Sequence, residues 1–136
     1  MAALPRLILY HKQKTSARTR FLRFADGVMA FEPLPALSVV SDTHSAVLPH
    51  PAACVKEAES RLGLPAGALR PEPEFQVEVE TPDGKVPVVL AEFTAIDPPF
   101  AAAEAVGARF IAITEARSLP AVELELMRRA YEVVLG

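Results

Sequence analysis

One predicted β-hairpin constrains the fold more than any other feature of the sequence. In its first arm, Phe75, Val77 and Val79 alternate with polar residues, which is the two-residue period of a strand with one buried face. Residues 82–84, Pro-Asp-Gly, supply the turn. The return arm, 86–94, is apolar almost throughout, which is typical of a strand buried on both faces. We therefore expect a sheet covered by helices.

The remaining elements alternate between strands and helices along a chain of 136 residues. Short apolar runs between prolines indicate strands, and apolar residues spaced three and four apart indicate helices. No repeat or linker divides the chain, so we expect a single domain over residues 1–136. The other predicted strands are 4–11, a hairpin over 20–32 around Asp26-Gly27, 36–41 and 108–114; the predicted helices are 51–62, 98–106 and 119–135.

Specific residues mark the ends of these helices. Pro51 suits the first turn of the first helix, and Gly63 suits the left-handed position just after it. Asp97 and Ser118 are expected to cap the second and third helices. The strands pair largely through hairpins, so the predicted fold class is mixed α/β, a curved mixed β-sheet sandwiched between helices.

Composition limits the setting in which the chain works. Apolar residues make up 51% of the sequence and charged residues 23%, as in globular proteins. No apolar run reaches the roughly 18 to 20 residues that span a bilayer, so no membrane association is expected. Cys54 is the only cysteine, and the first residues lack the pattern of a signal peptide. We expect a cytoplasmic protein without disulfides.

Positive charge is concentrated at the start of the chain. The first 25 residues hold six basic residues and no acid, whereas the rest holds eight basic and seventeen acidic residues. This asymmetry is consistent with an anion-binding surface or with a solvated loop. No aromatic interleaving or nucleic-acid motif accompanies it, so a nucleic-acid partner is not expected. The candidate anion ligands are Lys12, Lys14, Arg18 and Arg20.

Residues 56–64, Lys-Glu-Ala-Glu-Ser-Arg-Leu-Gly-Leu, resemble the core of the Nudix box. That core reads Arg-Glu-apolar-any-Glu-Glu-any-Gly-apolar, and the predicted order of elements around it also resembles the Nudix hydrolase fold. The resemblance implies a box helix that holds Mg²⁺ with glutamates. It also implies hydrolysis of a nucleoside diphosphate linked to another group, with the metal neutralising phosphate charge and activating water.

The box is degenerate where the chemistry requires carboxylates. Glu57 matches the first glutamate, but Ser60 and Arg61 replace the paired glutamates that follow. A guanidinium at position 61 repels a divalent cation. Glu59 lies about 200° around the helix from Glu57, so the two cannot share a face. We therefore expect a catalytically impaired Nudix-like domain, without a cofactor, that binds a phosphorylated small molecule or a protein partner.

Two alternatives remain open at this stage. A divergent hydrolase of nucleoside diphosphate derivatives would use Glu57 as its catalytic residue, with Mg²⁺ held also by acids outside the box, such as Glu92 or Glu115. A homodimer held through a strand edge or the last helix would need no ligand. Glu92, Asp97 and Glu115 follow or end strands, where α/β folds often contact ligands, so they are further candidate ligand-binding residues.

Two other groups of residues contain side chains of the types found in metal sites and catalytic triads. His44, His50 and Cys54 invite a metal site, but prolines flank His50 and a strong third or fourth ligand is missing, so no metal site is expected. Ser41, Asp42, His44 and Ser45 contain the residue types of a catalytic triad. No nucleophile elbow accompanies them, and no glycine-rich phosphate loop occurs.

Overall fold

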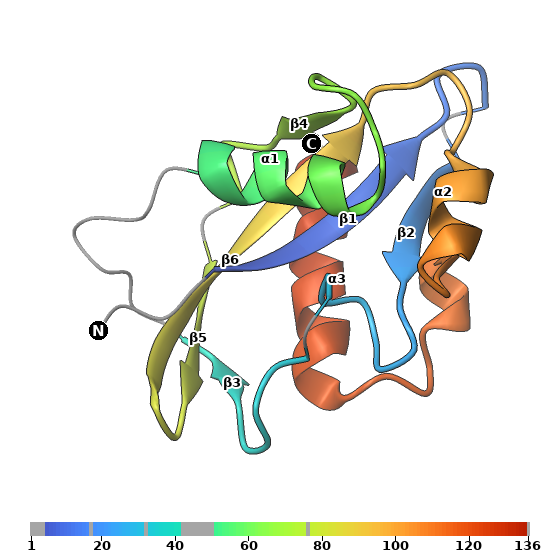
Figure 1. The fold of residues 1–136 in the computed structure, drawn as a ribbon. Helices are drawn as coiled ribbons and strands as arrows, with labels where there is room; N and C mark the ends of the chain where they lie inside the picture. The colour runs from blue at the N-terminus through green and yellow to red at the C-terminus, as the bar shows by residue number, and fades with distance from the viewer. Residues whose placement is uncertain (1–4, 17, 32, 42–50, 76, 136) are drawn as a thin grey trace.

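The computed structural model describes residues 5–16, 18–31, 33–41, 51–75 and 77–135. Seven strands, three α-helices and one short 3₁₀ helix lie within them (Figure 1). None of these helices is long and apolar enough to cross a membrane. In chain order the elements are β1 (Arg6–Lys12), β2 (Thr19–Arg23), β3 (Val39–Val40), α1 (Ala52–Arg61), β4 (Leu69–Pro71), β5 (Val77–Thr81), β6 (Gly84–Phe93), α2 (Phe100–Ala105), β7 (Arg109–Ile111), η1 (Ile113–Glu115) and α3 (Ala121–Leu135).

The seven strands form one mixed sheet, as the sequence predicts. Its order is β3-β5-β6-β1-β2-β7, and β4 pairs with the second half of β6. β1 and β6 run parallel, with Ile8 opposite Leu90, and every other strand pair among the described residues is antiparallel. The parallel pair places the carboxyl ends of β1 and β6 at the same end of the sheet.

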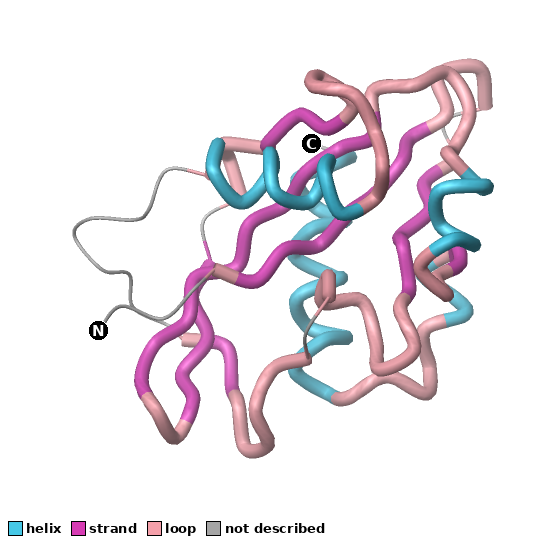
Figure 2. The backbone as a smooth tube through the Cα atoms, in the orientation of Figure 1, coloured by secondary structure: helices cyan, strands magenta, loops and turns pink. Residues whose placement is uncertain are grey.

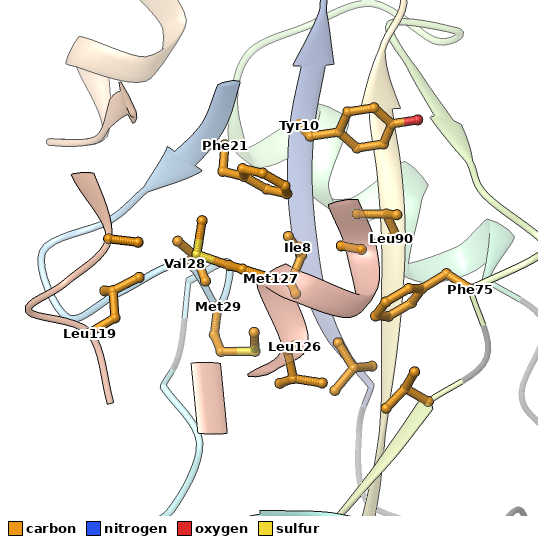
Figure 3. Close-up of a cluster of buried hydrophobic side chains, with 14 of the residues drawn as sticks. Ile8, Tyr10, Phe21, Val28, Met29, Phe75, Leu90, Leu119, Leu126 and Met127 are labelled. Atoms are coloured by element: carbon orange, nitrogen blue, oxygen red, sulfur yellow. The ribbon is translucent and has the colours of Figure 1, made fainter. Parts of the chain in front are cut away.

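Helices cover both faces of the sheet, so its central strands are buried on both sides. On β1, Ile8 and Tyr10 face α3, whereas Leu7 and Leu9 face α1 and α2. Figure 1 shows α3 behind the central strands and α1 in front of them. Figure 3 shows the core on the α3 side, where Leu126 gathers with side chains of β1 and β6.

Two predictions about local structure are confirmed in detail. The hairpin of β5 and β6 turns at Pro82-Asp83-Gly84, with Thr81 opposite Gly84. In α1, the predicted inward residues Val55, Ala58 and Leu62 are all buried. Gly63 takes the left-handed conformation after the helix, with φ +67°.

The predicted hairpin over 20–32 is wrong in its second arm. A bridge joins Phe24 to Gly27 across the turn, but the chain then leaves β2 and bridges Ile8 of β1 at Met29. β7 occupies the free edge of β2, so the returning segment pairs where β1 extends beyond β2. Figure 2 shows the described residues that follow β2 as loop up to β3.

Three further boundaries differ from the sequence prediction. Asp97 does not cap a helix at Pro98: α2 begins at Phe100 with no side-chain cap. The closing helix begins at Ala121 and not at residue 119, so Ser118 does not directly precede it as predicted. The hydroxyl of Ser118 instead accepts a hydrogen bond from Arg23 at 3.1 Å. The predicted strand over 108–114 is observed as β7, which ends at Ile111 and is followed by η1. The predicted strand over 36–41 is observed only as the two residues of β3.

Candidate functional site

The helix that resembles a Nudix box carries an ion pair on its exposed face. Nε of Arg61 lies 3.7 Å from Oε1 of Glu57, one helical turn away, and the two side chains are 54% and 69% exposed. Glu57 is the one residue of the box resemblance that keeps a metal-binding carboxylate on this face. Arg61 stands where the resemblance places a second one. This donor set does not suit Mg²⁺, because a guanidinium occupies the space beside the carboxylate.

Glu59 points away from this ion pair, as its helical position requires. It is 5% exposed, and its Oε2 accepts hydrogen bonds from the backbone N–H groups of Gly67 at 2.9 Å and Leu69 at 3.0 Å. Glu59 therefore fastens α1 to the start of β4. Its role in this structure is to hold the fold together.

A cationic cavity lies at the carboxyl ends of β1 and β6. It has a volume of about 100 Å³, and Lys12, Lys14, Arg70 and Glu92 line it together with the loop that follows β6. Lys12 and Lys14 come from β1 and the turn after it, and Arg70 comes from β4. The parallel pairing of β1 and β6, with Tyr10 opposite Glu92, brings these segments together.

Contacts within this cavity hold some of its charges in place. Nζ of Lys12 donates a hydrogen bond to the carbonyl of Val134 at 3.3 Å, where a cation is favoured at the end of α3. The guanidinium of Arg70 forms a salt bridge with the carboxylate of Glu92. Lys14 is exposed. Among the described residues that line the cavity, three cations thus face one carboxylate, so this lining carries excess positive charge.

Two ionisable groups beside the cavity are perturbed by burial. Burial raises the pKa of the Tyr10 phenol, and the negative charges of Glu92 and Glu72 raise it further. Burial also raises the pKa of the Glu72 carboxyl, which Glu92 raises further and Arg70 lowers. Arg70 lowers both pKa values, so its positive charge partly offsets burial and the acidic neighbours.

The other predicted anion ligands do not line this cavity. Arg18 is exposed and is not among the lining residues. Nη1 of Arg20 donates to the side chain of Gln13 at 3.3 Å, and Nε2 of Gln13 donates to Asp97 at 3.3 Å. This chain of contacts ties the loop after β6 to β1 and β2, so Arg20 and Asp97 have structural partners.

The candidate acids do not converge. Glu92 shares the α3 side of β6 with Leu90, whereas Glu57 is on α1, which covers the opposite face. Oε1 of Glu115 accepts a hydrogen bond from the backbone of Ala112 at 2.9 Å, within η1. Among the described residues, no three histidine, cysteine or acidic side chains lie close enough to hold a metal ion.

The remaining candidates are only partly within the described residues. Asp42, His44, Ser45 and His50 lie outside them. Cys54 is half-buried on α1, and burial raises the pKa of its thiol, with the nearby charge of Glu57 adding to the effect. A raised pKa lowers the reactive thiolate fraction, so Cys54 is a poor nucleophile.

Arg70 is a cavity residue that the sequence did not reveal. β4 has three residues and ends at Pro71, so it carries no alternating pattern that would reveal a strand. The available signal was the position of Arg70 just before the acidic run 72–74, which by itself does not say which element it joins.

Comparison with solved structures identifies the fold. The chain superimposes on a crystal structure of the Ap4A hydrolase of C. elegans over 100% of both chains, with a TM-score of 0.56 and 15% sequence identity. No protein-family model matches the sequence, and no curated protein matches it. The structural match, the seven-stranded mixed sheet and the helices that cover it show that the chain has a Nudix-like fold.

Proposed function

We propose that this Nudix-like domain binds a phosphorylated small molecule in the cationic cavity and does not catalyse the metal-dependent hydrolysis that the box resemblance implies. One observation carries the proposal: Lys12, Lys14 and Arg70, from two separate segments of the chain, line the same cavity. Arginine and lysine are the side chains that proteins use to bind phosphoryl groups.

The size of the cavity limits which part of a ligand enters it. Its volume of about 100 Å³ is well below the roughly 300 to 1,000 Å³ of sites that enclose a drug-sized ligand. A phosphoryl group fits in such a space, whereas a whole nucleotide does not. Ile96 also lines the cavity and is 85% exposed, so it offers apolar surface to the organic part of the ligand.

The ion pair on α1 supports the second half of the proposal. Arg61 places a positive charge beside Glu57, and the other candidate acids lie on other elements. Phosphoryl transfer by this fold family would require a divalent cation at that position. The residues of α1 instead favour a site from which cations are excluded.

Calorimetric titration tests the binding half of the proposal. Pyrophosphate and Ap4A serve as probes, and Lys14→Gln and Arg70→Gln remove one cavity cation each. We expect binding to the native chain and a loss of about ten- to a hundredfold in affinity for each variant, the range for a charge-assisted hydrogen bond. Arg18→Gln is the matched control, since it removes a nearby cation that does not line the cavity. Equal losses in all three variants would mean that only net charge matters.

The enzyme alternative makes a separate prediction. A divergent hydrolase would release phosphate or a nucleotide from Ap4A in the presence of Mg²⁺ or Mn²⁺, and Glu57→Gln would abolish the release. We expect no such release from the native chain. Turnover that depends on Glu57 would contradict the binding proposal and support the divergent hydrolase.

The homodimer remains a prediction, in which an outer strand of the sheet pairs with a second copy of the chain. Val39, on the outer strand β3, is 55% exposed and Leu37 before it is 87% exposed. Light scattering, compared between the native chain and Val39→Lys, tests it, because a charge on an edge strand disfavours pairing with a second edge.

A further inference from the structure

A second site lies around Arg61, away from the cationic cavity. Its guanidinium carbon is 4.7 Å from the centre of the Phe31 ring, a cation–π contact. Arg61 and Phe31 together line two hollows, of about 170 Å³ and about 300 Å³. The two hollows therefore meet at one stacked pair of side chains.

The backbone of Phe31 is held in a conformation that aromatic residues rarely adopt. Its φ is +65°, in the left-handed region that favours glycine. Such a conformation persists only where the surroundings enforce it, and it is found more often at binding sites than elsewhere. Here it places the ring of Phe31 5.3 Å from the ring of Phe24 and beneath Arg61.

Arg61 retains hydrogen-bonding capacity at this position. Its Nε faces Glu57, and none of the hydrogen bonds formed among the described residues uses its two terminal nitrogens. Those two nitrogens form a planar fork that matches a carboxylate or phosphate group. Its side chain is 54% exposed, so an anion from solvent can reach the fork.

The two hollows share Arg61 and differ in their other residues. Glu57 lines the smaller one together with the apolar residues Pro5 and Leu7. Most residues of the larger one are apolar, among them Phe24, Met29 and Val106, and Asp26 is its carboxylate. The guanidinium fork of Arg61 is therefore the group that can bind an anion, and the apolar residues of the larger hollow can contact a ring.

We infer that the Arg61–Phe31 pair is a binding site for a small aromatic anion, whose carboxylate or phosphate lies on the guanidinium fork and whose ring fills the larger hollow. The volume of about 300 Å³ is at the lower end of the range for small-molecule sites. A dry apolar cavity half that size, about 150 Å³, accepts benzene. One or two fused rings are therefore the right size.

Three probes with one ring system test the inference. 2-Naphthoate and 2-naphthyl phosphate carry the anion, and 2-naphthamide has the same rings without charge. By calorimetry we expect the anions to bind at least about tenfold more tightly than the amide, as one charge-assisted hydrogen bond implies. If only one anion binds more tightly than the amide, the inference stands and that anion identifies the ligand class. Equal affinity for all three probes, or binding of none, would overturn it.

Variants locate the site. Arg61→Gln is expected to weaken binding of the anions by at least about tenfold and leave the amide unaffected. Phe31→Asn removes the ring but keeps a residue that tolerates positive φ, so it is expected to weaken all three probes without unfolding the chain. Lys56→Gln, which removes a charge from the same helix outside both hollows, is the matched control.

The experiments distinguish failure of one proposed site from failure of the other. Lys14→Gln should leave naphthoate binding unchanged, and excess pyrophosphate should not displace naphthoate. If instead Lys14→Gln abolishes naphthoate binding and Arg61→Gln does not, the aromatic anion binds in the cationic cavity and the Arg61–Phe31 site is wrong.

Discussion

The carboxylate of Glu123 lies so close to Gly27 that a β-carbon built on the glycine would stand 2.2 Å from its Oε1. The same oxygen accepts a hydrogen bond from the backbone N–H of Val28 at 2.8 Å. Glu123 is 2% exposed, on the buried side of α3. The side chain thus joins the last helix to the turn after β2.

Gly27→Ala should destabilise the fold substantially. The added methyl group meets the Glu123 carboxylate, and the backbone φ of +144° strains any L-residue. We expect a loss of roughly 2 to 4 kcal/mol in the free energy of unfolding, from backbone strain and a disturbed buried hydrogen bond. Gly84→Ala is the control, because Gly84 has φ +125° but nothing within 4 Å of the added atom. Denaturant titrations showing equal losses in both variants would mean that strain alone matters.

The stability of the fold should depend on the protonation of Glu123. Burial raises the pKa of this carboxyl, against the opposing effects of the Val28 N–H and of Arg23. A raised folded-state pKa means that the folded chain binds the proton more tightly than the unfolded chain does. The contribution of Glu123 to stability is therefore highest below the ordinary pKa of glutamate and falls as pH rises through the raised value.

Glu123→Gln isolates this contribution. Its amide oxygen can still accept from Val28, but it does not titrate, so the variant should lose less stability as pH rises above the ordinary glutamate range. Glu72 also has a raised pKa and remains in both proteins. The difference between the two pH profiles, measured by thermal unfolding, therefore reports Glu123 alone. Parallel profiles would contradict the prediction.

Glu59 and Glu57 should differ in what they contribute to stability, although they lie two residues apart. Glu59→Ala leaves the N–H groups of Gly67 and Leu69 without their acceptor. The expected loss is about 2 to 6 kcal/mol, at about 1 to 3 kcal/mol for each unmet group. Glu57→Ala breaks only an exposed ion pair, so it should cost no more than about 1 kcal/mol. Chemical denaturation of the two variants gives the comparison directly.

The spacing of apolar residues predicted those helices and strands that local sequence determines. The first arm of the β5–β6 hairpin alternates apolar and polar residues and a strong turn follows it, and α1 has a clear apolar face followed by Gly63. Both are confirmed. The mixed α/β fold class follows from such local signals and is confirmed as well. The relation to the Nudix fold came from nine residues of the box together with the order of elements.

Long-range contacts account for what the sequence could not show. The turn at Asp26-Gly27 exists, but the chain after it leaves β2 and contacts β1 and Glu123, which is 95 positions from Val28 in the sequence. Arg70 joins the cationic cavity because β4 pairs with β6, a pairing that no local pattern marks. Asp97 binds Gln13 of the β1 end in place of its own helix.

The charge at one turn of α1 should decide whether the helix binds divalent cations. Ser60→Glu combined with Arg61→Glu restores the carboxylates that the Nudix box has at these positions. Breaking the exposed pair with Glu57 costs little, so the double variant should fold. We expect Mn²⁺ to stabilise it and not the native chain. At a tenfold excess over Kd the gain in stability is about 1.4 kcal/mol, or roughly 3 to 7 °C in Tm for a domain of this size.

Arg18→Glu with Thr114→Glu changes the net charge equally at separate exposed positions, so Mn²⁺ should not stabilise that control. Stabilisation of the native chain by Mn²⁺, abolished by Glu57→Gln, would show that Arg61 does not exclude the cation.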